Sequence, residues 1–239
     1  MEIILLTASA FVAATISGAI GMGGGTILIA VMASILPGAQ VVPLHGLVQM
    51  TSNASRTLIL LRRVAWWAFG FYVPLQLVGV YVAGLLYRDT PQDWLRPIIG
   101  AFLLATIAWK RLKPKRLDIP RWIFALGGFG GGILSIFVGV TGPYLAAFFL
   151  RDDMEKEEIV ATKAAIQMVG HVAKIPVFIA VGFPYREHID AVIPLLAAAL
   201  IGTFVGTRLL RSMAEKRFRT AFDTVLGLLA LRLLLEPVL

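Results

Sequence analysis

The residues from Ile3 to Leu36 carry no charged side chain, and nearly all of them are apolar. A run of about 18 or more apolar residues is long enough to cross a bilayer as a helix. Comparable runs recur along the whole chain of 239 residues, of which 58% are hydrophobic, so too few polar residues remain to cover the surface of a soluble domain. The sequence therefore predicts an all-α, polytopic membrane protein with the lipid bilayer as its surroundings.

Charge and cysteine content exclude several classes of function. The chain has no cysteine, which rules out disulfides, thiolate metal sites and cysteine catalysis. Its net charge of +8 would suit nucleic acid, but in membrane proteins Lys and Arg accumulate in cytoplasmic loops, and we interpret the charge in that way. No cluster of His, Asp and Glu has the spacing of metal ligands, and no motif of nucleophilic catalysis occurs. The sequence thus predicts no metal, no cofactor, no nucleic-acid partner and no enzyme activity.

A glycine-containing stretch followed by a polar helix occurs twice, at a constant offset of 118 residues. The offset places Gly21 on Gly139 and Gly24 on Gly142. Each copy ends in four polar residues at intervals of 4, 4 and 3, which puts them on one face of a helix. These two polar stripes are His45, Gln49, Asn53 and Arg56 in the first copy, and Lys163, Gln167, His171 and Lys174 in the second. The sequence therefore predicts two structural repeats.

The glycines at 21–25 interrupt the first apolar run. The 11 residues after this break, 26–36, would form about 16 Å of helix, which is too short to cross the membrane alone. We therefore expect a hairpin or broken helix with its turn inside the membrane, and a second one at the equivalent break, 139–143. Another glycine cluster, 127–132, we interpret as a site of close helix packing. The other expected helices are 43–61, 65–87, 95–109, 159–181, 189–207 and 220–235.

Each repeat is expected to hold a glycine-broken helical hairpin and three transmembrane helices. The first repeat covers residues 1–111 and the second 121–239, joined by a basic linker, 112–120. If the repeats are inverted, the loops on one side hold 16 Lys and Arg and those on the other hold 3, whereas parallel repeats would give 9 and 10. Because basic loops favour the cytoplasm, we expect inverted repeats in the inner (plasma) membrane, with the basic loops cytoplasmic. The oligomeric state stays open, a homodimer included.

The breaks and the stripes together suit an anion. A helix that restarts after a break presents free N–H groups and the positive end of its dipole, and glycine lets a ligand approach the backbone closely. Arg56 and Lys174 are cations at membrane depth, and neither stripe contains a carboxylate. Inverted repeats with broken helices are typical of secondary transporters, which bind substrate near the middle of the membrane. The candidate substrate-binding residues are Gly23, Gly24, Gly25, Gln49, Asn53, Arg56, Thr141, Gly142, Gln167, His171 and Lys174.

Other interpretations of these residues stay open at this point. The glycines could serve helix packing, and Gln49 and Gln167 could join helices by hydrogen bonds. His45 and Lys163 lie near segment ends, from which their side chains could reach the membrane interface. His171 could be a hydrogen-bonded core histidine or a proton carrier.

The Gly-x-Gly-Gly-Gly stretch at 21–25, repeated in altered form and followed each time by a polar stripe, resembles the sulfite exporter TauE/SafE family over essentially the whole chain. The second copy departs from a pure glycine tract and reads Val140-Thr141-Gly142-Pro143. The resemblance implies a transporter of sulfite or of small organosulfonates such as sulfoacetate. Without the resemblance, the residues predict only that the substrate is a small anion, which we expect a secondary transporter to export by alternating access. An anion channel and an importer of another small organic anion are the alternatives.

Overall fold

The computed structural model describes residues 1–21, 23–111, 120–149 and 153–209. In these ranges the regular structure is α-helical, with three short 3₁₀ turns and no strand. The predicted helix 220–235 lies outside the described residues, as does most of the linker 112–120 and of the basic loop that follows residue 207. Three stretches are long and apolar enough to cross a membrane, Glu2–Ala19, Trp66–Tyr87 and Tyr185–Leu209. The structure therefore agrees with the prediction of an all-α, polytopic membrane protein.

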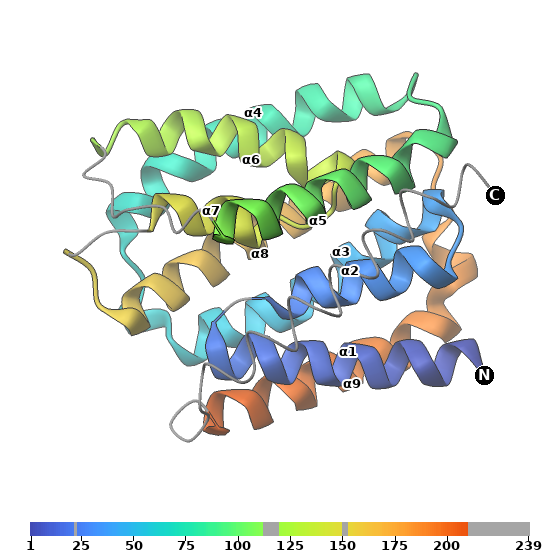
Figure 1. Ribbon diagram of the computed structural model, residues 1–239, viewed down its shortest axis with the longest axis horizontal. Helices are drawn as coiled ribbons and strands as arrows, with labels where there is room; N and C mark the ends of the chain where they lie inside the picture. Colours follow the sequence, from blue (N-terminus) through green and yellow to red (C-terminus); the bar gives the residue numbers. More distant parts are fainter. Residues whose placement is uncertain (22, 112–119, 150–152, 210–239) are drawn as a thin grey trace.

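The first glycine break turns the chain back on itself. Helix α1 (Glu2–Ile20) ends at the break, and α2 (Gly24–Ile35) returns beside it, as Figure 1 shows. Gly21 and Gly23 have φ angles of 76° and 95°, a region that residues with a Cβ seldom adopt. The break is therefore a hairpin turn that requires glycine, as the sequence predicts.

The second break has the same form with a shorter return arm. Helix α6 (Ile123–Phe137) ends before Gly139, whose φ is 81°, and α7 (Gly142–Phe148) follows it. Pro143 lies in the first turn of α7, where backbone N–H groups have no intrahelical partner, so the missing N–H of proline costs no hydrogen bond. Both hairpin turns thus lie at positions that the offset of 118 residues relates.

The glycine cluster at 127–132 does not break α6. A Cβ on Gly128 would overlap the carbonyl oxygen of Tyr72, and one on Gly132 would overlap that of Gln76, both on α4 (Trp66–Tyr87). These glycines let the backbones of α4 and α6 approach each other, which confirms the packing interpretation.

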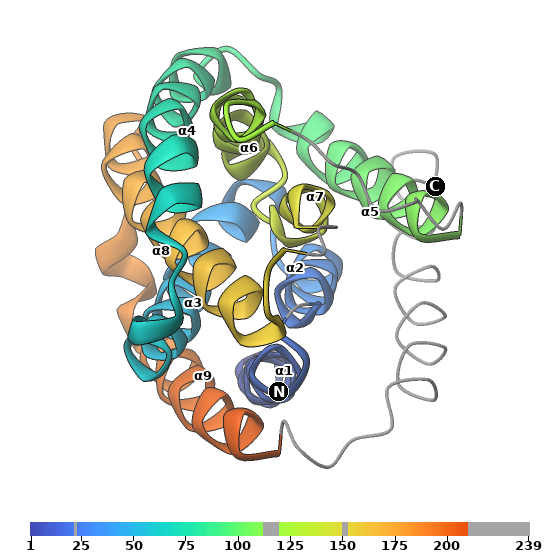
Figure 2. The same cartoon turned by 90° about the vertical axis from the view of Figure 1, so that its left-hand side faces the viewer.

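The two striped helices lie against each other in the interior. Helix α3 (Gly38–Ile59) begins five residues earlier than predicted and includes Pro43, and α8 (Lys156–Ala180) begins three residues earlier. They pack along one another, and their other neighbours include α9 (Ile189–Leu209) beside α3 and α4 beside α8. Figure 2, viewed along the molecule, shows α3 and α8 between the other helices. This placement lets both helices carry polar stripes that a lipid-facing helix would not tolerate.

Two long helices, α4 and α9, each pack mainly on a helix from the other half of the chain. Helix α4, from the first half, packs most extensively on α6, and α9, from the second half, packs most extensively on α1. Helix α5 (Leu95–Arg111) lies at the edge of the bundle (Figure 2). Each side of the molecule is therefore built from both halves.

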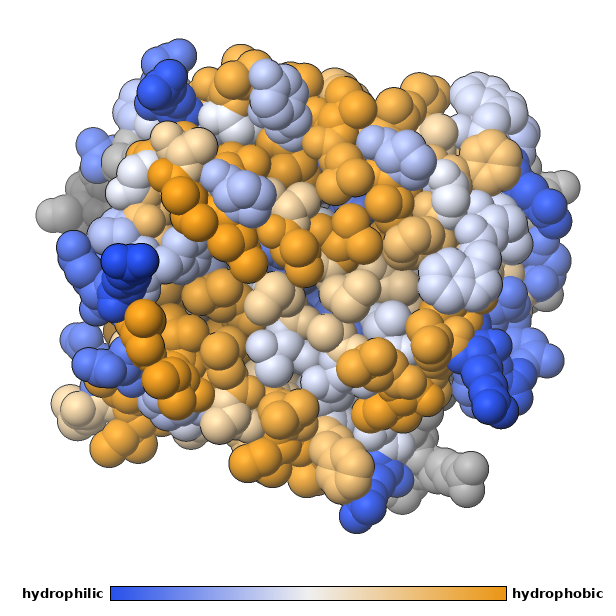
Figure 3. Space-filling view, turned by 180° about the vertical axis from the view of Figure 1, so that it is seen from behind, coloured by the Kyte–Doolittle hydropathy of each residue, from blue (hydrophilic) through white to orange (hydrophobic). Residues whose placement is uncertain are grey.

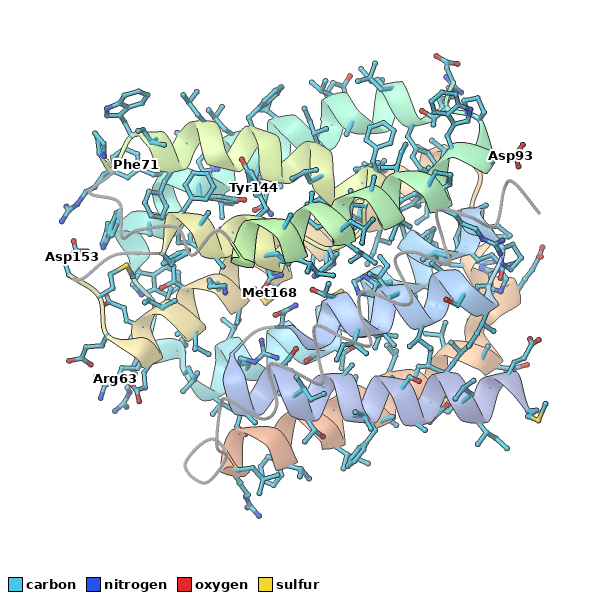
Figure 4. The ribbon with its side chains drawn as sticks, viewed as in Figure 1. Arg63, Phe71, Asp93, Tyr144, Asp153 and Met168 are labelled. Carbon is cyan, nitrogen blue, oxygen red and sulfur yellow. The ribbon has the colours of Figure 1, made fainter. Side chains whose placement is uncertain are left out.

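The surface has an apolar belt between two polar ends. Figure 3 shows hydrophobic side chains across the middle of the molecule and hydrophilic ones at its two ends. Large hydrophobic side chains exposed on the surface include Leu85, Ile193 and Phe204. In Figure 4, Arg63 and Asp153 lie at one end and Asp93 at the other. This distribution is the one expected when the long axis of the molecule crosses a bilayer.

Candidate anion site

The two hairpin turns and the two polar stripes meet around one small cavity. Its volume is about 20 Å³, which is room for about one water molecule. Met168, the chain neighbour of lining residue Gln167, lies about midway between the two ends of the molecule (Figure 4). The lining residues are Ser17, Gly21, Gly23, Gly25, Thr26, His45, Gln49, Asn53, Arg56, Val140, Gly142, Gln167 and His171. The cavity is therefore shared by both halves of the chain.

Eight of the eleven predicted site residues line this cavity. The other three, Gly24, Thr141 and Lys174, are buried beside it without lining it. Sequence reasoning missed Ser17 and Thr26, whose small hydroxyl side chains are among several Ser and Thr of two mostly apolar helices and belong to neither stripe. Their position on the hairpin arms next to the break was the only available signal.

Arg56 is a buried cation that its own helix holds in place. Its Nη1 donates to Asn53 Oδ1 at 3.3 Å and its Nη2 to Ser52 Oγ at 3.2 Å, and the side chain is 3% exposed. Asn53 Nδ2 in turn donates to the Gln49 carbonyl at 2.9 Å, which fixes the amide. Within the described ranges Arg56 has no carboxylate partner, and its Nε is buried without a hydrogen bond. Burial of a charge is costly unless it is paired, so the site has unused capacity for a negative group.

Lys174 directs its charge at the second break rather than into the cavity. Its Nζ donates to the carbonyl oxygen of Gly139 at 2.7 Å and lies 3.1 Å from Nδ1 of His171, and the side chain is 1% exposed. Arg56 and Lys174 are equivalent under the offset of 118, yet only Arg56 lines the cavity. Lys174 therefore acts on the cavity through His171, which does line it.

His45 holds the first break in a comparable way. Its Nε2 is 2.9 Å from the carbonyl oxygen of Gly25, so the imidazole donates there. The rings of His45 and His171 meet edge to face, with centroids 5.9 Å apart, and join α3 to α8. His45 and Lys163 are both buried, so the structure favours an interior position for them over the interfacial alternative.

The two glutamines each lie against the glycine break of their own half of the chain. A Cβ on Gly25 would lie 3.0 Å from the Gln49 amide nitrogen, and one on Gly142 would lie 3.4 Å from that of Gln167. Each amide therefore closes one side of the cavity where glycine leaves the backbone uncovered.

Replacement of His45 by phenylalanine tests whether this imidazole supports the first break. Phenylalanine keeps an aromatic ring but removes the donor, so the Gly25 carbonyl loses its hydrogen bond from His45, and we expect the protein to lose about 0.5–1.5 kcal/mol of stability. Thermal unfolding in detergent would show this as a lower midpoint. His188→Phe is the matched control, because His188 stacks on Phe183 in a 3₁₀ turn outside the cavity. Equal midpoints for the two variants would contradict a supporting role.

Comparisons with known proteins cover nearly the whole chain. The family model of the sulfite exporter TauE/SafE matches residues 6–233, a range that contains both breaks and both polar stripes. One similar protein is the probable inner membrane transporter protein TsaS of Comamonas testosteroni. It is 25% identical over 169 residues, which cover 69% of this chain and 70% of that protein. No solved structure shows detectable similarity to the chain.

Proposed function

The chain belongs to the sulfite exporter TauE/SafE family, and from that premise we propose that it carries a small sulfur-containing oxyanion, sulfite or an organosulfonate such as sulfoacetate, across the inner membrane. Membership makes it a membrane transporter and not an enzyme. The proposed binding residues are the predicted ones that line the cavity: Gly23, Gly25, Gln49, Asn53, Arg56, Gly142, Gln167 and His171. Gly24, Thr141 and Lys174, which are buried beside the cavity, are proposed to support them.

The observation that carries this proposal is the buried guanidinium of Arg56. It lines a cavity between the two breaks, has no carboxylate partner among the described residues, and keeps its Nε unengaged. A sulfite or sulfonate group is a compact oxyanion, and a guanidinium donates to such groups through several N–H bonds at once. The neighbouring amides of Gln49 and Gln167 add neutral donors from both halves of the chain.

We further infer that the two halves are inverted repeats. The offset of 118 maps α1 onto α6, and the two helices run in opposite directions along the molecule (Figure 1). Their main partners are reciprocal, since α1 packs on α9 and α6 packs on α4. Such reciprocal packing is expected when two repeats are related by a pseudo-twofold axis.

Alternating access suits a cavity of this size. At about 20 Å³ it cannot hold a sulfite ion unless its walls separate, so the anion must enter through a rearranged state. The cavity lies between α1, α2 and α3 on one side and α7 and α8 on the other. We propose that these groups separate toward one end of the molecule at a time.

The proposed direction is export. The end that holds Arg62, Arg63 and Arg121 is the cytoplasmic one by the positive-inside rule. An inside-negative potential favours outward movement of an anion by about 2.3 kcal/mol per charge for each 100 mV. We therefore propose that the membrane potential contributes to driving export.

Purified protein in proteoliposomes tests the transport proposal. We expect uptake of labelled sulfite to saturate with concentration and to be faster when the vesicles contain unlabelled sulfite, because a carrier must return between transport events. Sulfoacetate, sulfate and acetate should be compared as competitors under the same conditions. Flux that rises linearly with concentration and shows no counterflow would identify a channel instead.

A further inference from the structure

The hydrogen bonds around Arg56 end on a residue from the other half of the chain. Ser52 Oγ, which accepts from Arg56 Nη2 at 3.2 Å, lies 2.8 Å from Thr203 Oγ1 on α9. Both hydroxyls are fully enclosed, with Ser52 1% and Thr203 0% exposed. Thr203 does not line the cavity and belongs to neither polar stripe.

The direction of the first of these bonds is fixed, because a guanidinium only donates, so Ser52 Oγ is the acceptor for Arg56. In the second bond, at 2.8 Å, either hydroxyl can be the donor, since Ser52 Oγ has one hydrogen and a second lone pair to offer. In both cases the bond to Thr203 limits the rotation of the Ser52 hydroxyl and leaves a lone pair turned toward Arg56 Nη2.

The position of Thr203 is itself tightly defined. A Cβ on Gly18 of α1 would lie 2.8 Å from the Thr203 carbonyl oxygen, so the two backbones are in close contact. Helix α9 also packs on α3, the helix that carries Arg56. The threonine is therefore held by two helices of the first half.

We propose that Thr203 is a positioning residue for the transported anion, acting on Arg56 through Ser52; this inference rests on the proposed function. Its hydroxyl sets the orientation of Ser52, and Ser52 sets the orientation of the guanidinium. Without it, the Ser52 hydroxyl is free to turn toward a carbonyl of its own helix, as serine side chains in helices do. The anion site is then complete only when α9, from the second half, is seated on α3.

The test compares three variants by sulfite flux in proteoliposomes. Thr203→Val keeps the shape and removes the hydroxyl, and we expect the KM for sulfite to rise about three- to tenfold with little change in maximal flux. Thr203→Ser retains the hydroxyl and should restore the KM. Thr106→Val is the matched control, because Thr106 is a buried threonine whose hydroxyl donates to the Phe102 carbonyl of its own helix. Without anion, Thr203→Val should melt within the range of this control.

Testing Thr203→Val in a protein that also carries Arg56→Lys distinguishes a failure of this inference from a failure of the proposed function. Arg56→Lys keeps the charge but loses the planar fork of donors, so Thr203→Val should have little further effect on KM in it. A full additional rise in KM in that background, or no rescue by serine, would overturn the positioning role and leave the anion site standing. If Arg56→Lys alone has the same KM as the wild type, both the site assignment and the role of Thr203 are wrong.

Discussion

Replacing Arg56 with methionine is expected to weaken sulfite binding by about 10- to 150-fold, the factor that corresponds to losing a hydrogen-bonded charge partner. Arg56 is the buried cation that lines the cavity with an unengaged Nε. Methionine fills much of the same space without charge or donors. The measurement is the half-saturation concentration for sulfite flux, together with the thermal stabilisation that added sulfite gives the purified protein.

The same variant should not lose stability when no anion is present. A buried charge without a carboxylate is costly, and its replacement by an apolar side chain of similar volume is often neutral or stabilising. We therefore expect Arg56→Met to unfold in detergent at a midpoint no lower than that of the wild type. If Arg56→Met is no longer stabilised by added sulfite but unfolds at the wild-type midpoint without it, the role of Arg56 is to bind the anion and not to stabilise the fold.

Arg63→Met is the matched control for Arg56. Arg63 pairs with Glu155 at 3.0 Å at one end of the molecule, and its side chain is 59% exposed. Ion pairs this exposed contribute about 0–1 kcal/mol, so the control should transport sulfite almost as the wild type does. Wild-type affinity in Arg56→Met, or equal losses in both variants, would remove the central argument for an anion site at the breaks.

Gly24→Ala is expected to prevent normal folding of the first hairpin. A Cβ at this position would overlap the carbonyl oxygen of Ala13 on α1, and backbone cannot move aside as a side chain can. Overpacking of this kind costs about 3 kcal/mol or more. The yield of monodisperse protein in size-exclusion chromatography and the unfolding midpoint should both fall sharply.

Gly142→Ala is the matched control, because Gly142 is the counterpart of Gly24 in the second repeat. A Cβ on Gly142 would lie 3.4 Å from the Gln167 amide nitrogen, an ordinary contact. This variant should therefore fold, with any effect confined to transport. A well-folded Gly24→Ala protein would show that α1 and α2 are not packed as closely as the structure places them.

The hairpins and the stripes could be predicted because each has a local cause. Glycine in the left-handed region, followed by an apolar run too short to cross a membrane, predicts a turn at Gly21 and at Gly139. The intervals in the stripes predict one polar helical face, and eight of the eleven predicted site residues do line one cavity. The start of α3 was predicted less accurately, since the expected helix begins at residue 43 and the observed one at Gly38, with Pro43 inside it.

The roles of individual polar side chains could not be predicted. Lys174 and Arg56 are equivalent in sequence, but Lys174 donates to the Gly139 carbonyl while Arg56 lines the cavity. Ser52 and Thr203 are separated by 151 residues and have no shared pattern, so nothing in the sequence indicates their bond.

From the pattern of residues alone, the chain can be recognised as an all-α membrane protein with two similar halves, two glycine breaks and two cationic stripes. This is possible because hydrophobicity, glycine content and helical spacing act over short stretches of chain. The three-dimensional packing was needed to show that α4 and α9 pack on the opposite halves, that the breaks and stripes enclose one cavity, and which of the two equivalent cations lines it. These features depend on side chains from distant segments filling the same space, and a pattern along the chain does not contain that information.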